Sequence, residues 1–348
     1  MQRQSAILKT VRPDCNRIVI RSTNWLGDAV MSLPAIRAVR DAYPRAHLAV
    51  VARPWVADLY SREPAIDRVI VYPGRRWSFI RQLRAERFDC AILLQNAFEA
   101  ALVARLAGIP RRIGYARDGR GWLLTDAIPV PLPGEIPRHE RFYYLELLRR
   151  AGIIDRLPES DAIRLSGWGS GGGETTGISP GAAYGNAKRW LPERFAEAAL
   201  RLGGPVAVFG SAGERALCET VAEAIRRGGG TAHNFAGETS LSQFIEMAAA
   251  CRVFLTNDSG AMHIASALGV PTVTVFGATD HTTTGPTGPL ARVVRQPVDC
   301  SPCLLRECPI DHRCMTRVTV EQVVAAATLW TPDTKSLPVN PQSKLPAG

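Results

Sequence analysis

Short Val- and Ile-rich runs alternate with helix-like segments along most of the chain, and this alternation limits the fold more than any other feature. In the first half, RIVIRS at 17–22 is followed by DAVMSLPAIRAVRDAY at 28–43 and HLAVVAR at 47–53. In the second half, GPVAVFGS at 204–211 precedes ERALCETVAEAIRR at 214–227. Strands and helices that alternate in this way build parallel sheets covered by helices. The sequence therefore predicts an α/β fold with doubly wound parallel sheets.

The alternation is interrupted by a glycine-rich stretch, LSGWGSGGGETTG at 165–177, that has no hydrophobic periodicity and is typical of a hinge. A chain of 348 residues is long enough for two cores of ordinary domain size. We therefore expect one domain over 1–165, a hinge over 166–177 and a second domain over 178–330. The polar, Pro-rich end at 331–348 is predicted to be a disordered tail.

The charge balance favours anionic partners. Lys and Arg number 42 against 32 Asp and Glu, a formal net charge of +10. The basic residues form no long run and lack interleaved aromatic residues, which argues against nucleic acid as a partner. No apolar run approaches the roughly 18 residues of a membrane span, and the first residues lack the apolar core of a secretory signal. These features predict a cytoplasmic protein.

Four of the eight cysteines cluster in CSPCLLRECPIDHRC. They are Cys300, Cys303, Cys308 and Cys314. Four thiolates could hold one zinc ion in a tetrahedral site. The alternative is a reduced, thiol-rich loop, because the second pair departs from the usual zinc spacing.

A carboxylate follows the first predicted strand. The segment TNWLGDAV at 23–30 places Gly27 and Asp28 at a strand-to-helix turn, where parallel sheets bind their ligands. Asp28 could point into such a cleft. The alternative is a helix N-cap, in which the carboxylate accepts hydrogen bonds from free backbone N–H groups. Taken alone, the segment favours the cap.

The second predicted domain has a comparable turn. VFLTNDSGAMHIASALG at 253–269 indicates a buried strand, a turn and a helix. The helix N-terminus would present free N–H groups after Ser259, and Gly260 would let a diphosphate approach the backbone. The alternative is a well-capped helix in which His263 is a partly buried first-turn residue. The segment by itself does not decide between these two interpretations.

Lys188 adds a second observation, because it is the only lysine between residues 10 and 334. It follows the predicted strand GISPG at 177–181, so it should lie at the same sheet edge as Ser259 and Gly260. An ammonium can stabilise the charge that builds on a leaving diphosphate. The alternative is a solvated loop residue. The chain has no P-loop, and its one G-x-G-x-x-G match, GWGSGG at 167–172, lies in the glycine-rich stretch and not at a strand-to-helix turn. The pattern therefore favours a nucleotide-diphosphate cleft opposed by a carboxylate.

Five segments, in order from about residue 17 to residue 330, resemble the ADP-heptose:lipopolysaccharide heptosyltransferases of glycosyltransferase family 9, and among them most resemble heptosyltransferase II. They are STNWLGDAVMSLPAIRAVRDAYP, LQNAFEAALVARLAGIPRRIGYARDGRGWLLTD, PGAAYGNAKRWLPERFAE, VAVFGSAGER and TNDSGAMHIASALGVPTVTVFGATD. The resemblance implies a GT-B fold, in which two Rossmann-like domains bind the acceptor (N-terminal) and the sugar nucleotide (C-terminal). It implies inverting, metal-independent transfer of L-glycero-D-manno-heptose from ADP-heptose, without a cofactor, to heptosyl-Kdo2-lipid A at the cytoplasmic face of the inner membrane.

The resemblance also assigns roles to residues. Asp28, beside Asn24 and Gly27 in the cleft turn, matches the general base that deprotonates the acceptor. Lys188 matches the lysine that holds the donor phosphates, and Asp258 the carboxylate bound to heptose hydroxyls. The remaining donor-binding residues implied in this way are Ser259 and Gly260 around the diphosphate, Glu214 near the ribose, Thr239 on the adenine side, and His263.

Other interpretations remain open at this stage. The chain could be a heptosyltransferase I or III, a nucleotide-sugar-binding protein without catalytic activity, or a zinc-stabilised nucleic-acid binder. Several arginines could meet acceptor phosphates, although a solvated surface position is the more common fate of such residues. They are the arginines at 75, 76, 81, 117 and 120.

Overall fold

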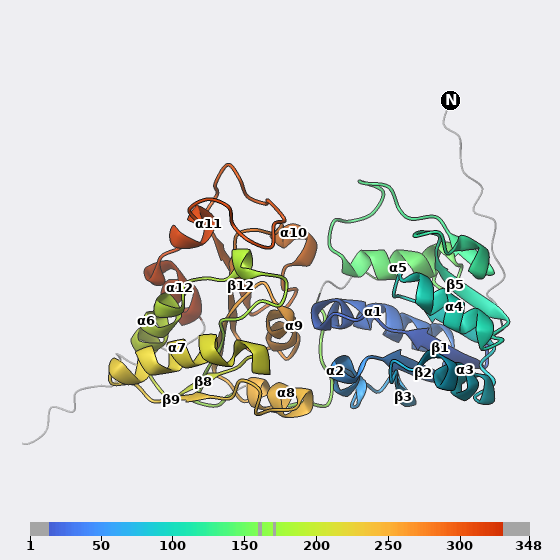
Figure 1. Ribbon diagram of the computed structural model, residues 1–348, viewed down its shortest axis with the longest axis horizontal. Coiled ribbons are helices and arrows are strands. Elements are labelled where there is room, and N and C mark those ends of the chain that lie inside the picture. The colour runs from blue at the N-terminus through green and yellow to red at the C-terminus, as the bar shows by residue number, and fades with distance from the viewer. Residues whose placement is uncertain (1–13, 159–161, 170–171, 330–348) are drawn as a thin grey trace, which may run out of the picture.

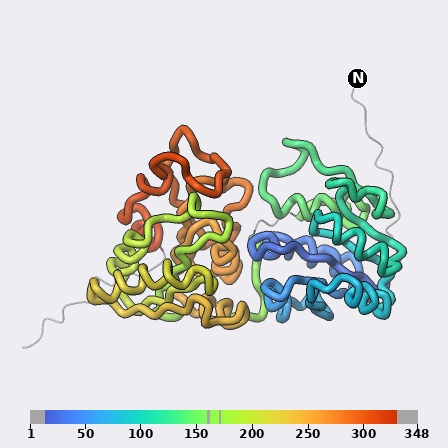
Figure 2. The backbone as a smooth tube through the Cα atoms, viewed as in Figure 1, coloured from blue at the N-terminus to red at the C-terminus, as the bar shows by residue number. Residues whose placement is uncertain are grey.

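The computed structural model describes residues 14–158, 162–169 and 172–329, which form two lobes, each built around a six-stranded parallel sheet (Figures 1 and 2). The predicted doubly wound α/β fold is therefore confirmed. The predicted tail at 331–348 lies outside the described residues. No helix within the described ranges is both long enough and apolar enough to cross a lipid bilayer.

The N-terminal lobe has the strand order β3-β2-β1-β4-β5-β6. This is the strand order of Rossmann folds. Its strands are β1 Arg17–Arg21, β2 His47–Ala52, β3 Arg68–Val71, β4 Cys90–Leu93, β5 Arg111–Tyr115 and β6 Asp126–Ile128. Its helices are α1 Leu26–Ala42, α2 Pro54–Ala57, α3 Arg76–Ala85, α4 Phe98–Leu106 and α5 Arg141–Arg150, with 3-10 turns η1 Asp58–Tyr60 and η2 Gly121–Leu123.

The C-terminal lobe repeats this topology in the order β12-β11-β10-β7-β8-β9. Its strands are β7 Thr176–Ser179, β8 Val206–Val208, β9 Ala232–Asn234, β10 Val253–Asn257, β11 Thr272–Phe276 and β12 Ala291–Arg295. Its helices are α6 Pro192–Leu202, α7 Arg215–Arg227, α8 Leu241–Ala249, α9 Gly260–Ala267, α10 His281–Thr284, α11 Arg313–Thr316 and α12 Val320–Thr328, with 3-10 turns η3 Asn186–Lys188 and η4 Ala212–Glu214.

The central strands pair in a register that places the functional turns together. Strand β7 pairs with β10, with Ser179 opposite Thr256. The chain leaves both strands at the same edge, so the loop that contains Lys188 and the turn that begins α9 lie side by side. In the N-terminal lobe, β1 lies between β2 and β4, and α1 follows it at the corresponding edge.

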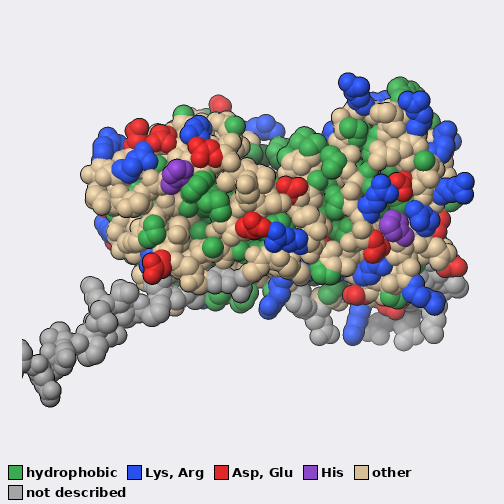
Figure 3. All heavy atoms as spheres, turned by 90° about the horizontal axis from the view of Figure 1, so that it is seen from below, with side chains coloured by type: hydrophobic (Ala, Val, Ile, Leu, Met, Phe, Trp, Pro, Cys, Tyr) green, Lys and Arg blue, Asp and Glu red, His purple; other side chains and the backbone are tan. Residues whose placement is uncertain are grey.

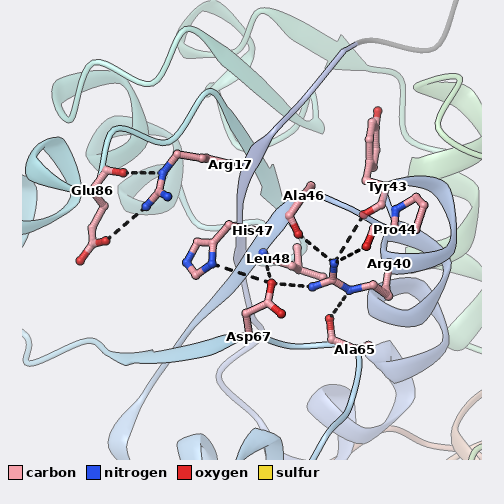
Figure 4. A network of polar contacts seen from close by, with 10 residues as sticks. All are labelled: Arg17, Arg40, Tyr43, Pro44, Ala46, His47, Leu48, Ala65, Asp67 and Glu86. Atoms are coloured by element: carbon pink, nitrogen blue, oxygen red, sulfur yellow. Dashed lines mark hydrogen bonds and ion pairs between the residues drawn. The ribbon is translucent and has the colours of Figure 1, made fainter.

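A polar network fixes α1 on its sheet (Figure 4). Arg40, in the last turn of α1, donates hydrogen bonds to the backbone oxygens of Ala65 (2.9 Å) and Ala46 (2.8 Å). It also donates to Asp67 Oδ2 at 2.6 Å, and the same oxygen accepts from the backbone N–H of Leu48 at 2.7 Å. This network ties the end of α1 to the segments around β2 and β3, so the start of α1 is held at the opposite edge, facing the other lobe.

The hydrophobic core has one apolar cluster inside each lobe and a further cluster that both lobes share. The shared cluster runs from α1 and α5 of the N-terminal lobe to α8 and α9 of the C-terminal lobe. Leu165 and Trp168, in the connecting segment, belong to this cluster. Helices α1 and α9 pack directly against each other. The two lobes therefore share apolar packing in this structure.

The beginning of the predicted hinge packs against the N-terminal lobe. Arg37 Nη2 donates to Ser166 Oγ at 3.4 Å, and the Arg62 guanidinium lies 4.2 Å from the Trp168 ring. Strand β7 already begins at Thr176, inside the range predicted as hinge. Gly177 is needed there for packing, because a Cβ atom on it would lie 2.5 Å from the Phe254 ring. The domain boundaries themselves stay a prediction.

Candidate active site

A cavity of about 660 Å³ opens between the two lobes. Its N-terminal wall consists of the first turn of α1 with Trp25 and Trp55. Its C-terminal wall comes from the loops after β7, β8 and β10 and from the start of α8. Nine of the ten residues that the sequence proposed for the site line this one cavity. They are Gly27, Asp28, Lys188, Glu214, Thr239, Asp258, Ser259, Gly260 and His263.

Asp28 lies in the first turn of α1 and does not cap that helix. The N-cap position is Trp25, and it has no side-chain cap hydrogen bond. The capping alternative for Asp28 is therefore wrong, because the helix begins two residues earlier, at Leu26. Burial raises the pKa of the Asp28 carboxyl to about 6, with Lys188 lowering it and Asp258 raising it. A carboxylate with this pKa is a stronger base than an ordinary aspartate and is still mostly ionised at pH 7.

The first turns of α1 and α9 meet at close range. A Cβ atom on Gly27 would lie 2.9 Å from Cδ2 of His263, and one on Gly260 would lie 3.0 Å from the Leu26 side chain. Glycine at these two positions lets the helix N-termini approach each other across the cavity. His263 is buried, and burial lowers its pKa to about 4, so its imidazole is neutral at pH 7.

Lys188 and Asp258 form an ion pair in the C-terminal wall. The Lys188 Nζ atom donates to Asp258 Oδ2 at 2.6 Å, and Thr279 Oγ1 donates to the same oxygen at 2.5 Å. Asn257 holds the two loops together, because its Nδ2 donates to the Pro180 backbone oxygen at 2.7 Å. Lys188 is therefore not the solvated loop residue of the alternative interpretation.

The backbone at the start of α9 is available to a ligand. Ser259 occupies the N-cap position, but its side chain makes no cap hydrogen bond, and its Oγ instead lies 3.2 Å from Thr256 Oγ1. The first N–H groups of a helix have no partner within the helix. Ser259 and Gly260 both line the cavity, so this end of α9 is a suitable seat for a negatively charged group.

Glu214 and Thr239 lie together with two aromatic side chains. Glu214 Oε2 accepts from the Ser211 backbone N–H at 2.9 Å and from Ser211 Oγ at 2.8 Å, which fixes the loop after β8. The Phe209 and Phe244 rings meet edge to face at 5.2 Å, and both line the cavity. This part of the cavity combines an apolar aromatic surface with a carboxylate, a suitable environment for a nucleoside.

Two sequence-based expectations need correction. Asn24 is not among the residues that line the cavity, and its side chain accepts a hydrogen bond from Arg21 Nη2 at 3.2 Å. Arg120 is fully buried and does not lie at the surface; it donates to the backbone oxygens of Tyr115 (3.0 Å) and Gln95 (2.5 Å). A buried guanidinium with backbone acceptors has a structural role.

The sequence reasoning missed the aromatic lining of the cavity. Trp25 and Trp55 are each 59% exposed, and the Trp55 Nε1 atom donates to the Asn24 backbone oxygen at 2.9 Å. Tyr184, in the glycine-containing loop before Lys188, is a third lining residue. The available signal was sequence proximity, because Trp25 lies two residues before Gly27 and Tyr184 lies four residues before Lys188.

The cysteine cluster does not form the tetrahedral site that its composition suggested. Among the described residues, no three His, Cys, Asp or Glu side chains form a group that could hold a metal ion. All four cysteines are free, and Cys300 is exposed whereas Cys314 is buried. Cys314 packs under the end of β11, where a Cβ atom on Gly277 would lie 2.7 Å from its sulfur. The zinc hypothesis is therefore not supported by this structure.

The surface charge agrees with the absence of a basic run in the sequence. On the face shown in Figure 3, Lys and Arg side chains are spread over both lobes among acidic side chains and do not merge into one continuous patch. Several of the arginines belong to ion pairs, such as Arg62 with Glu246 and Arg138 with Asp280. Both of these pairs join the two lobes.

Comparison with known proteins identifies relatives over most of the chain. The model of glycosyltransferase family 9 (heptosyltransferase) matches residues 76–149 and 156–313. Lipopolysaccharide heptosyltransferase 2 of Escherichia coli K12 is 32% identical over 305 residues, which cover 80% of this chain and 88% of that protein. Lipooligosaccharide heptosyltransferase 2 of Haemophilus ducreyi is 30% identical over 317 residues, with the same two coverages.

A solved structure, that of E. coli ADP-heptose lps heptosyltransferase II, matches with a TM-score of 0.75 and 30% identity. The match covers 90% of this chain and 98% of that one. The GT-B arrangement predicted from the sequence, two Rossmann-like lobes with a cleft between them, is thereby confirmed. Together with the family match, these similarities show that the chain is an enzyme that belongs to glycosyltransferase family 9.

Proposed function

We propose that the enzyme transfers L-glycero-D-manno-heptose from ADP-heptose to the inner core of lipopolysaccharide and that it adds the second heptose. The names of the two relatives described above, both heptosyltransferases 2, support this substrate assignment. The observation that carries the proposal is that Asp28 of one lobe and the Lys188–Asp258 pair of the other line a single cavity.

The donor binds to the C-terminal lobe in this proposal. The nucleoside lies against Phe209 and Phe244, with Glu214 and Thr239 at its ribose and adenine sides. The diphosphate lies at the start of α9, where Ser259 and Gly260 present backbone N–H groups beside the Lys188 ammonium. Asp258 has one oxygen free of Lys188 and Thr279, and this Oδ1 atom is the one that would accept hydrogen bonds from heptose hydroxyls.

The chemistry is an inverting displacement. The Asp28 carboxylate takes the proton from an acceptor hydroxyl while the hydroxyl oxygen attacks the anomeric carbon of the heptose. The bond between that carbon and the diphosphate oxygen breaks on the opposite face, and ADP leaves with the bonding electron pair. Lys188 and the N-terminus of α9 stabilise the charge on the leaving diphosphate. In the proposed mechanism this stabilisation comes from groups of the protein, so the transfer is metal-independent and uses no cofactor.

The acceptor, heptosyl-Kdo2-lipid A, binds to the N-terminal lobe. Asp28, Trp25 and Trp55 form the wall of the cavity on that side. An acceptor anchored in a bilayer requires that the enzyme work at the membrane surface. We therefore place the protein in the cytoplasm, in peripheral contact with the inner membrane, and a net charge of +10 favours contact with anionic lipid.

A transfer assay tests the proposal. Purified enzyme is incubated with ADP-heptose and with acceptors that carry no heptose or one heptose, and the product masses are measured. The proposal predicts that the acceptor with one heptose gains the mass of a heptosyl residue. Gain only by the acceptor without heptose would make the enzyme a heptosyltransferase I, and no gain by either acceptor would refute the function.

A further inference from the structure

The proposed donor cavity has an unfavourable charge balance. Four formally charged side chains line it, the carboxylates of Asp28, Glu214 and Asp258 and the ammonium of Lys188. The Lys188 charge is already paired with Asp258 at 2.6 Å. A sugar-nucleotide diphosphate would add further negative charge to a lining that is negative overall, and like charges at such short range repel. The cavity therefore needs another cation close to the diphosphate seat.

The cysteine-rich segment at 300–314 lies directly behind the loop that contains Lys188. Tyr184 Oη donates to the Leu304 backbone oxygen at 2.7 Å. The Ala187 backbone N–H donates to the Arg306 backbone oxygen at 3.0 Å, and His312 Nε2 donates to the Ala187 backbone oxygen at 3.1 Å. Three hydrogen bonds thus join this segment to Tyr184 and Ala187, in the loop just before Lys188.

This attachment places a cation beside the cavity. The Arg306 guanidinium lies 5.3 Å from the centroid of the Tyr184 ring, and the Lys188 Nζ atom lies 4.8 Å from the same centroid. Tyr184 itself lines the cavity. Within the described ranges, no carboxylate lies at ion-pair distance from Arg306, whereas Arg313 of the same segment pairs with Asp311 at 2.9 Å.

We propose that Arg306 is a second cation of the donor site, which binds the donor diphosphate together with Lys188, and that the cysteine-rich segment supports it there. This inference rests on the proposed function, because it needs a diphosphate in the cavity. A guanidinium can bind two phosphate oxygens at once, which a single ammonium cannot do with the same geometry. Tyr184 is a positioning residue in this arrangement, since its ring contacts both cations and its hydroxyl is fixed on Leu304.

Isothermal titration calorimetry with ADP tests the inference on the full chain. We compare the wild type with Arg306→Lys, Arg306→Ala and Arg306→Glu, and use Arg313→Ala as the matched control that removes a paired arginine from the same segment. We expect the dissociation constant to rise in the order Lys, Ala, Glu, with Arg306→Ala about tenfold weaker than wild type, the scale of one partly exposed charge contact. The control should bind ADP like the wild type. Raising the salt concentration should reduce the difference between wild type and Arg306→Ala.

The outcomes separate this inference from the proposed function. Equal ADP affinity of wild type and Arg306→Ala refutes the role of Arg306, while continued heptose transfer by the wild type leaves the function intact. Equal losses in the Lys, Ala and Glu variants, without dependence on charge, also refute it, because they indicate a structural role. Failure of the wild type to bind ADP refutes both the inference and the proposed function.

Discussion

Replacement of Asp28 by asparagine tests the chemistry most directly. The carboxylate lies in the cavity, is not used as a helix cap, and has a pKa raised to about 6 by burial. Asparagine keeps the shape of the side chain and cannot accept the proton. We expect transfer to fall by roughly a hundredfold or more, which is about 3 kcal/mol in the activation free energy. ADP affinity should not fall, since Asp28 lies in the opposite lobe from the proposed phosphate seat and its replacement removes a negative charge from the cavity lining.

The pH dependence of the same reaction provides an independent measurement. With a pKa of about 6, Asp28 is half protonated at pH 6, so kcat/KM should fall tenfold for each further pH unit below that value. An unperturbed aspartate would place this fall near pH 4. The rate of ADP release, measured from pH 5 to pH 8 with saturating and limiting acceptor, gives the profile. The residual activity of Asp28→Asn should not follow it.

Glu140→Gln is the matched control for this experiment. Glu140 is partly buried at the start of α5, and burial, followed by the Asp28 charge, raises its pKa to about 7. Glu140 is therefore protonated in the range where Asp28 titrates, and glutamine resembles that protonated form. We expect Glu140→Gln to keep the fall in activity near pH 6. An Asp28→Asn variant with more than a tenth of wild-type turnover, or a wild-type profile that is flat down to pH 5, would refute the assignment of the base.

Three further predictions follow from the same contacts. Lys188→Ala should weaken ADP binding at least tenfold by calorimetry and lower turnover as well; an unchanged dissociation constant would remove Lys188 from the phosphate site. Gly185→Ala should also weaken ADP binding, because a Cβ atom at this position overlaps the Arg306 backbone oxygen and would push the cysteine-rich segment away. Gly229→Ala is the comparison for a general loss of stability, because its φ of +84° strains an alanine there while no neighbouring atom is displaced. Asp28→Asn should raise the free energy of unfolding at pH 8 by about 1–3 kcal/mol, because the folded state disfavours the ionised form. Since the folded pKa lies above the unfolded value, this gain should decrease between pH 6 and pH 4 and be absent below pH 4 in chemical denaturation curves.

The sequence predicts the interior of each sheet better than its edges. The interior strands β1, β2, β8 and β10 are apolar, largely buried runs, and all four were expected from the Val- and Ile-rich segments. Of the edge strands, β3 has a recognisable Val- and Ile-rich run, whereas β6, β9 and β12 were not expected, because they are short or alternate buried with exposed residues and so resemble loops. The pattern of a buried parallel strand is strong only where helices cover both faces.

The site was predictable where a turn follows a strand, and less so where distant segments meet. Asp28 and Ser259 could be placed from the alternation alone, since carboxyl ends of parallel strands share one edge. The cysteine-rich segment contacts Ala187 through Arg306, and these two residues are 119 positions apart in the sequence. No local sequence pattern predicts a contact over such a distance. Arg120 was misread for a related reason, because its backbone acceptors on Gln95 and Ala97 belong to another loop.

The structure also explains why position 188 has the only lysine between residues 10 and 334, a region that otherwise uses arginine for its permanent positive charges. The ammonium carries three hydrogens in tetrahedral directions. One is donated to Asp258 at 2.6 Å, and the ammonium lies 4.8 Å from the Tyr184 ring centroid, so at least one donor remains for a phosphate oxygen. A planar guanidinium bound to Asp258 would have its donors fixed in a single plane. It would also need more room than this position offers, because the Lys188 side chain is only 13% exposed. The compact ammonium therefore suits the enclosed position against Asp258. The larger planar guanidinium suits the exposed position of Arg306, the second cation near the Tyr184 ring.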